Sequence, residues 1–164
     1  MITQYFLQQE LNRILGIEAQ LAVALPFVAE STQHHRLQRL FRYQVGQTRR
    51  QRDRLLGAEE MTGITLREAR CDSAEVLIAD LREVVEIQSN ASLRDLMLAN
   101  KMRLIKNYET TSYSRALHYT WELGYIALSE LLDAIRQEEK RTEAKLTVMI
   151  HDLTINLNQV DLSV

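Results

Sequence analysis

The sequence predicts an all-α protein built as a bundle of four long helices, and three observations support this fold class. One Pro and five Gly among 164 residues leave few interruptions of regular structure. Apolar residues recur at steps of three and four over several long stretches, which is the spacing of one helix face. Only short turns separate these stretches within each half of the chain. With 46% apolar residues, positions 1–164 suit a single domain with a sizeable core.

The first two helices are predicted over residues 2–30 and 33–56, with a short turn of capping residues between them. Pro26 lies within the apolar stripe of the first helix. Because the stripe continues beyond this proline, we expect a kink there and not an end. The inner face of the second helix is expected to carry Leu37, Phe41, Val45, Thr48, Arg52 and Leu55.

The second half of the chain predicts one short helix and two long ones. An irregular segment leads to a short crossover helix over 73–88. Ser92 and Asp95 then resemble a capping box that opens a helix over 93–123, and the last helix is predicted over 125–157. Two tight hairpins joined by one long connection give the up-down order, with a single crossover, of ferritin-like bundles.

Three of the four apolar stripes carry one glutamate near the centre, namely Glu18, Glu109 and Glu139. An unpaired buried carboxylate is costly, so it takes a proton or recruits a cation. Glu109 lies 15 residues before Gly124 and Glu139 lies 15 residues after it. Because Gly124 is the turn of an antiparallel hairpin, these two acids stand at the same height. The pattern predicts a shared polar centre inside the bundle.

The chain resembles the YciF/YciE-type ferritin-like family of bacterial stress-associated proteins. The resemblance extends over essentially the whole chain and rests on segments that match in order and spacing: 17–26, 71–78, 93–125 and 138–146. It implies a dimeric four-helix bundle with a two-metal carboxylate centre. It also implies expression linked to osmotic or oxidative stress.

The chain departs from the family's ligand pattern in two of its helices. Typical members supply a Glu on the first helix, a Glu-Glu-x-His run on the second, a Glu-His-x-x-Glu-like cluster on the third and a Glu-rich run followed by Asp on the fourth. The second-helix run is replaced here by residues 46–49, and the Glu-His pair of the third helix by Lys106 and Asn107. The acids that remain are Glu18, Glu109, Glu138 and Glu139, with Glu143 in place of the Asp.

A two-metal centre needs about four carboxylates and two nitrogen ligands, so we expect no metal, no other cofactor and no catalytic residue here. We interpret the centre as a buried ion-pair layer in which basic side chains replace the metals. Its predicted members are Glu18, Arg49, Arg52, Lys106, Glu109 and Glu139. The protein is then a non-catalytic bundle.

Two alternatives stay open. The first is a ferritin-like redox protein that binds iron, manganese or a single divalent cation, with Glu18, Glu109, Glu139 and Glu143 as the remaining ligands. The second is a helical protein-interaction module. Leu96, Met97 and Leu104 are its candidate contact residues, although they could equally pack beneath the crossover helix.

Charge and composition exclude several other classes. A net charge of −2 gives no field that favours nucleic acid or a membrane surface, and the arginines of residues 49–54 spread around their helix. Cys71 is the single cysteine, which excludes an internal disulfide. The chain start lacks the features of a secretory signal, and the longest apolar stretch, 21–29, is too short for a bilayer. We therefore expect a cytoplasmic protein, and the family resemblance implies that it is a homodimer. Four histidines are predicted to lie away from the centre: His34, His35, His118 and His151.

Overall fold

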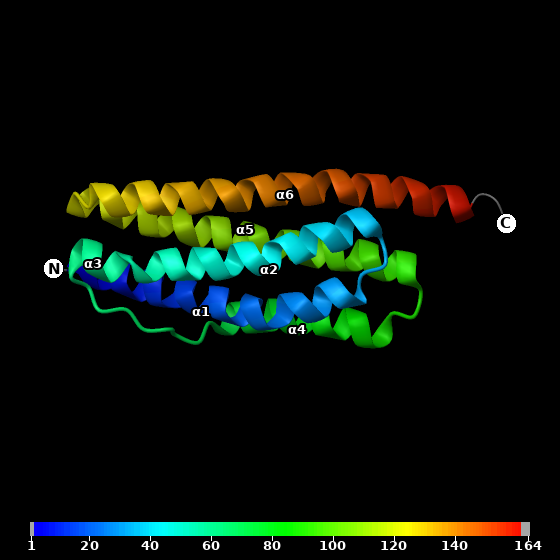
Figure 1. Ribbon diagram of the computed structural model, residues 1–164, viewed down its shortest axis with the longest axis horizontal. Helices are drawn as coiled ribbons and strands as arrows, with labels where there is room; N and C mark the ends of the chain where they lie inside the picture. The colour runs from blue at the N-terminus through cyan, green and yellow to red at the C-terminus, as the bar shows by residue number, and fades with distance from the viewer. Residues whose placement is uncertain (1, 162–164) are drawn as a thin grey trace.

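The computed structural model describes residues 2–161, and within them it contains six helices and no strand (Figure 1). Four long helices lie side by side as a bundle, and α4 packs against α1 and α5. The predicted all-α four-helix bundle with a crossover helix is confirmed. The helices are α1 (Ile2–Ser31), α2 (His35–Leu56), α3 (Ala58–Thr62), α4 (Asp72–Ile87), α5 (Ala91–Leu123) and α6 (Ile126–Asp161).

The predicted helix boundaries differ from the observed ones by at most four residues, and one short helix was missed. Helix α3 lies in the segment that the sequence analysis treated as irregular, and it ends at Gly63, whose φ of 71° is left-handed. Five residues are too few to show a helical period in the sequence. Pro26 lies inside α1, which continues to Ser31. Gly124 ends α5 with a φ of 72°, as its place in the sequence predicted.

The core consists of two apolar clusters at opposite ends of the bundle. One cluster is formed where the end of α1 meets the start of α2, and it includes Leu25, Phe41 and Leu98. The other is formed where the start of α1 meets the end of α2, and it includes Leu7, Leu55, Leu128 and other buried residues. Along every long helix, a buried polar stretch separates the two clusters. The buried polar residues of these stretches include Glu18 on α1, Glu109 on α5 and Glu139 on α6, and on α2 they are Gln44, Gln47, Thr48 and Gln51.

The start of α5 shows how the predicted capping box was wrong. Asn90 caps this helix, because its side chain accepts a hydrogen bond from the Leu93 N–H at 3.0 Å. The buried carboxylate of Asp95 instead accepts hydrogen bonds from the backbone N–H groups of Gln33 and His34, the latter at 2.6 Å. Asp95 therefore satisfies donors of the α1–α2 turn, which lies more than sixty residues earlier in the chain.

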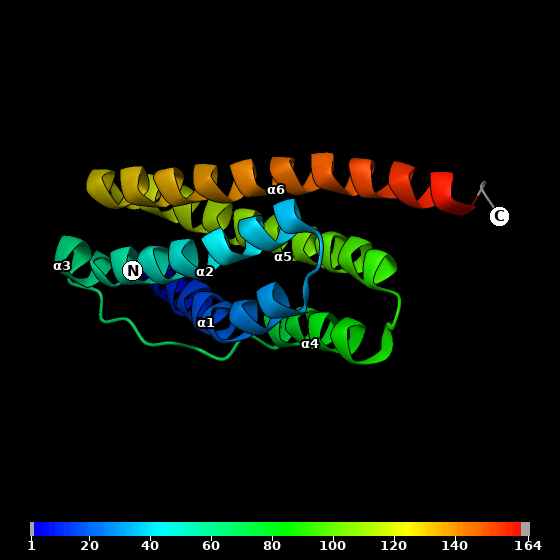
Figure 2. The same ribbon diagram turned by 45° about the vertical axis from the view of Figure 1, so that its right-hand side comes forward.

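The extended segment between α3 and α4 runs along α1 (Figure 2). Its Arg67 N–H donates to Asn12 Oδ1 at 2.7 Å, and its Ala69 N–H donates to the Asn12 carbonyl at 3.0 Å. Gly16 makes this close approach possible, because a Cβ at that position would lie 1.8 Å from the Ala69 carbonyl oxygen. Gly16 thus fixes the position of the segment on α1.

Helix α1 is long and apolar enough to cross a membrane by length and composition alone, and 56% of that stretch is buried inside the bundle. Helix α1 is also a core helix of the bundle, since its side chains Leu7, Leu11, Leu21 and Leu25 have no exposed surface. Leu96 and Met97 are partly buried and pack against the core cluster that contains Phe41. Leu104 is 53% exposed.

Candidate functional site

The centre of the bundle holds a buried lysine between two buried glutamates. Lys106 on α5 has no exposed surface, and its Nζ lies 2.9 Å from Glu109 Oε2 and 2.7 Å from Glu139 Oε2. Both carboxylates are at most 1% exposed. The ammonium group therefore joins α5 to α6 at the height that the spacing from Gly124 predicted.

Glu18 enters the same layer from α1 and is held by a tyrosine. The Tyr113 hydroxyl on α5 donates to Glu18 Oε1 at 2.6 Å, and both side chains have no exposed surface. Tyr113 lies one turn after Glu109 on α5, so its ring packs within the apolar cluster that contains Leu7 while its hydroxyl reaches the polar layer. This hydrogen bond connects α1 with α5.

Helix α2 contributes amides and a hydroxyl to the layer. The Gln51 Nε2 donates to Glu139 Oε1 at 2.6 Å and to Glu138 Oε2 at 3.0 Å. Two turns earlier on α2, Gln44 Nε2 donates to Gln47 Oε1 at 2.6 Å and to Thr142 Oγ1 at 2.9 Å. These bonds connect α2 with α6 along the polar layer.

Several buried atoms of this layer have no hydrogen-bond partner among residues 2–161. They are Glu18 Oε2, Gln44 Oε1, Thr48 Oγ1, Gln51 Oε1 and Glu109 Oε1. An unpartnered buried polar atom costs about 1 to 3 kcal/mol. The layer therefore contains more buried polar atoms than its hydrogen bonds and ion pairs satisfy.

Burial and charge together set the protonation of the layer. Burial, followed by the charge of Glu139, raises the pKa of Glu18 to about 8 against the opposing effects of Lys106 and Tyr113. The same two causes raise the pKa of Glu109 well above its ordinary value. For Lys106, burial lowers the pKa, but the charges of Glu109, Glu139 and Glu18 outweigh burial and raise it overall.

These directions limit the charge that the layer carries. The pKa of Glu18, raised to about 8, favours the protonated form of this side chain at neutral pH. The pKa of Glu109 is shifted in the same direction, because burial disfavours its charged form. The Lys106 ammonium lies 2.9 Å from Glu109 and 2.7 Å from Glu139, so its positive charge offsets negative charge in the apolar interior.

The structure brings together only part of the predicted ion-pair layer. Glu18, Lys106, Glu109 and Glu139 meet as described, but Arg49 is exposed and does not reach the centre. Arg52 pairs with Glu68 at the outside of the bundle. The placement of both arginines in the centre was wrong, because α2 is rotated so that 44, 48 and 51 face inwards.

Glu143, the fourth predicted ligand of the metal alternative, is also outside the centre. Its Oε1 accepts a long hydrogen bond of 3.4 Å from Asn107 Nδ2 at an exposed position. The histidines lie elsewhere too: the His34 Nδ1 accepts from the Leu37 N–H at the start of α2, and His118 pairs with Glu122 at 3.0 Å. His35 and His151 are exposed.

Sequence reasoning missed three residues of the layer, namely Gln44, Gln51 and Tyr113, whereas Thr48 was predicted on the inner face. A signal for α2 was present, because positions 37, 41, 44, 48, 51 and 55 follow steps of four and three without a break. The predicted inner face carried Val45 and Arg52 at the places where the structure has Gln44 and Gln51.

The side chains of the layer do not fit a two-metal carboxylate centre. The space between Glu109 and Glu139 is filled by the ammonium of Lys106, and α2 supplies amides where nitrogen and carboxylate ligands are needed. Over residues 2–161, no group of three or more His, Cys, Asp or Glu side chains is arranged to hold a metal ion.

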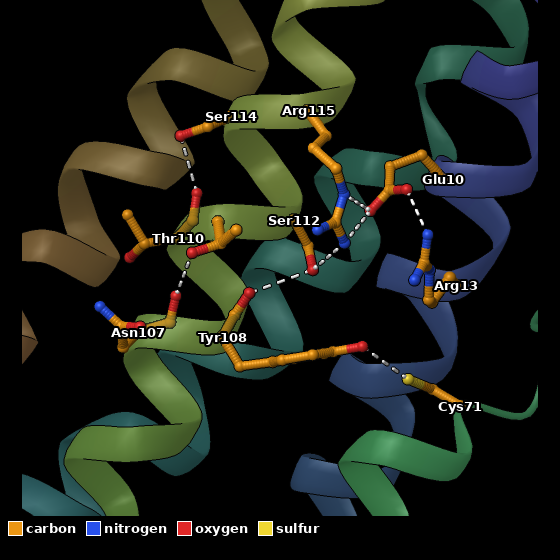
Figure 3. Close-up of polar contacts among 10 residues, drawn as sticks. Glu10, Arg13, Cys71, Asn107, Tyr108, Thr110, Ser112, Ser114 and Arg115 are labelled. Atoms are coloured by element: carbon orange, nitrogen blue, oxygen red, sulfur yellow. Dashed lines mark hydrogen bonds and ion pairs between the residues drawn. The ribbon is translucent and has the colours of Figure 1, made fainter.

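A second charged cluster lies nearer the surface, between α1 and α5 (Figure 3). Glu10 Oε1 lies 3.0 Å from Arg115 NH2, and Glu10 Oε2 lies 2.5 Å from Arg13 NH2. Close by, the Tyr108 hydroxyl and the Cys71 thiol lie 3.5 Å apart. Cys71 is a free, buried cysteine, as the sequence analysis expected.

The fold and its centre thus define an all-α, ferritin-like bundle whose middle layer is ion-paired. The family model described as "Domain of unknown function (DUF892)" matches residues 3–157, and the chain belongs to this family. It is similar to Protein YciF of Escherichia coli (strain K12), with 31% identity over 147 residues, which cover 89% of this chain and 86% of that protein.

Two solved structures resemble the chain closely. The crystal structure of the E. coli stress protein YciF matches with a TM-score of 0.89 and 27% identity, over 94% of this chain and 97% of the other. YcfI from Rhodopseudomonas palustris matches with a TM-score of 0.85 and 22% identity, over 88% and 92% of the two chains. The second likeness is a likeness of fold alone. Together these matches make the chain a member of the YciF-type family.

Proposed function

We propose that this chain is a non-catalytic bundle of the YciF type in which an internal ion pair takes the place of the metal centre that the family resemblance implies. One observation carries the proposal: the Lys106 ammonium lies within 3 Å of both Glu109 and Glu139 in a fully buried layer. Those carboxylates are the ones a metal would need.

The physical reason lies in the charge of the layer. A metal bound by these glutamates would have to share the space with an ammonium group, and the two cations would repel each other strongly at low dielectric. Removing the proton from Lys106 is also unfavourable, because the neighbouring acids raise its pKa. The ion pair therefore excludes a divalent cation from between Glu109 and Glu139 by charge and by occupied volume.

The role of such a layer is to fix the alignment of the helices. Buried ion pairs contribute little net stability, but they penalise any packing that leaves one member alone. Lys106 and Tyr113 select one register for α5 against α6 and α1, because a shift by one turn would separate each from its partner. The protein is then a structural or interaction component. We extend to it the stress association and the homodimer that the resemblance implies, and the cytoplasmic location that its cysteine content favours.

Metal analysis of the purified chain tests the proposal directly. Protein produced in iron- and manganese-rich medium is passed over a sizing column and measured by plasma mass spectrometry. The expected content is below about a tenth of an equivalent of any transition metal per chain. A content near one or two equivalents would support the redox alternative and overturn the proposal.

A variant at the centre supplies the matched comparison. Lys106→Glu removes the cation and adds a negatively charged carboxylate, whereas Lys106→Gln removes the cation and adds only a neutral amide. We expect Lys106→Glu to bind Mn²⁺ measurably in titration calorimetry, while the wild type and Lys106→Gln do not. Equal Mn²⁺ binding by wild type and Lys106→Glu, both folded by circular dichroism, would show that Lys106 is not what excludes the metal.

The stress association and the dimer need separate measurements. Transcript levels after osmotic shock and after peroxide treatment are expected to rise in at least one case, and unchanged levels in both count against the association. Sedimentation equilibrium is expected to give twice the mass of the chain, which is 19.1 kDa. A monomer at all concentrations contradicts the dimer.

A further inference from the structure

A basic pocket lies on the outer face of the bundle between α2 and α6. It has a volume of about 250 Å³, and four cationic side chains line it: Arg50 and Arg54 from α2, and Arg141 and Lys145 from α6. The ring of Tyr43 lies between two of them, with Arg50 and Lys145 at 6.0 Å and 5.9 Å from its centroid. The pocket borders the buried polar layer, because Gln47 and Thr142 line the pocket and both accept a hydrogen bond from Gln44 of the layer.

The charge of this pocket is not balanced by the protein. Glu138 is the only acid in its wall, and it already pairs with Arg54 at 2.7 Å and accepts from Gln51. Within the part of the chain that the structure describes, no carboxylate lies within 4.0 Å of Arg50, Arg141 or Lys145 in an ion pair. Like charges that converge on one concavity raise the local concentration of anions.

The pocket floor adds a fixed hydrogen-bond donor. Gln47 lines the pocket and is 7% exposed, and its Oε1 is held by the Gln44 amide at 2.6 Å. Because its carbonyl is engaged on the protein side, the Gln47 amide hydrogens are available to an anion. Gln44 itself is anchored to Thr142, so the donor does not have to be ordered on binding.

The geometry points to a binding site for a small phosphate-bearing anion at this place. A phosphate group has acceptors in several directions and suits guanidinium groups that approach from two helices, whereas a carboxylate offers two oxygens in one plane. The ligand is a small molecule and not a nucleic acid, because the cations gather in one pocket while the whole chain carries a charge of −2. This inference does not depend on the proposed metal-free centre.

Titration with simple phosphates tests the site on the full chain. The probes are inorganic phosphate and pyrophosphate, with sodium chloride at matched ionic strength as reference and a short DNA duplex as competitor class. Pyrophosphate is expected to bind saturably and to raise the melting temperature above that in the chloride reference. Phosphate is expected to bind more weakly, because it engages fewer of the cations.

Variants of equal charge change make the test specific. The double variant Arg50→Gln with Arg141→Gln is expected to weaken pyrophosphate binding at least tenfold. Arg42→Gln with Arg49→Gln removes the same charge from exposed arginines of α2 that do not line the pocket, and it is expected to bind as the wild type does. All four positions lie at the surface or in the pocket wall, so folding is checked by the unliganded melting temperature.

Three outcomes would overturn the inference. They are the absence of saturable pyrophosphate binding by the wild type, an equal loss of affinity in both double variants, and binding of the DNA duplex without binding of pyrophosphate. The second outcome would show a general charge effect instead of a site. The third would assign the cations to a nucleic-acid surface.

Discussion

Two groups of ion pairs hold α5 in the bundle, and they differ mainly in burial. At the centre, Lys106 and its two glutamates are at most 1% exposed. Near the surface, Arg13 and Arg115 flank the buried Glu10 with side chains that are 39% and 41% exposed. The distances are similar, between 2.5 and 3.0 Å. The comparison teaches that the surroundings of a pair, and not its length, decide what its loss would cost.

The largest expected effect comes from removing the buried cation. Lys106→Met leaves Glu109 and Glu139 without their partner, so we expect a loss of about 3 to 5 kcal/mol in the free energy of unfolding at pH 8. Urea unfolding at pH 8 measures it.

Lys101→Met is the matched control for this variant, since Lys101 pairs with Asp80 at 3.0 Å with a side chain that is 34% exposed. Its expected loss is below about 1 kcal/mol. If the two lysine variants lose similar amounts, burial does not distinguish the two kinds of ion pair.

The second effect is a fall in stability as the pH rises. The pKa of Glu18 is raised from its ordinary 4.5 to about 8, so the folded chain holds a proton that the unfolded chain has released between these values. The stability from this group is fully present below pH 4.5 and is lost as the pH rises through 8. The slope contributed is about 1.4 kcal/mol for each pH unit.

Glu18→Gln tests this origin of the slope. The variant has no proton to lose, so its free energy of unfolding between pH 5 and 8 should vary less than that of the wild type. Glu130→Gln, at an exposed position of α6, should leave the wild-type slope unchanged. A Glu18→Gln variant with the full wild-type slope would place the titrating proton elsewhere.

A somewhat smaller effect is expected from the tyrosine of the layer. Tyr113→Phe removes the hydrogen bond that the tyrosine hydroxyl donates to Glu18 Oε1 and should cost about 1 to 3 kcal/mol. Because that bond lowers the pKa of Glu18, its loss should also move the pH dependence to higher pH. Thermal unfolding over a pH series measures both. Tyr119→Phe, at a partly buried ring stacked on Phe6, is the control and should change neither quantity.

The smallest effect belongs to the surface cluster. Arg115→Ala leaves Glu10 paired with Arg13, so we expect a loss of at most about 1 kcal/mol, which should fall further in high salt. Unfolding by a non-ionic denaturant, at low and at high salt, measures this loss in the free energy of unfolding. A loss comparable to that of Lys106→Met would mean that this cluster is as strongly coupled as the centre.

The sequence alone predicted the fold and the glutamates of the central layer, because both follow from the helical periodicity of apolar residues. Glu18, Glu109 and Glu139 interrupt apolar stripes, and a charged residue in such a stripe is visible in any helical reading. The basic partner was harder to place. Lys106 lies one turn before Glu109, so its reach could be anticipated, whereas the orientation of α2 depended on Gln44 and Gln51.

Glutamines carry little information in a hydropathy pattern, since they occur on surfaces and in buried networks alike. The prediction that Asp95 caps its own helix was wrong for a different reason. Its spacing from Ser92 matched a local cap, but the carboxylate bonds the turn between α1 and α2. No local pattern reveals a partner that is distant in the chain.

The hydrogen bonds that Asp95 accepts from the α1–α2 turn make the two hairpins depend on each other. The backbone donors of Gln33 and His34 lie in the turn of the first hairpin, and the acceptor that satisfies them belongs to the second. A fragment that stops before α5 would present open amide groups at its turn. Separate fragments should therefore recover their native helicity by complementation, each serving as the template for the other.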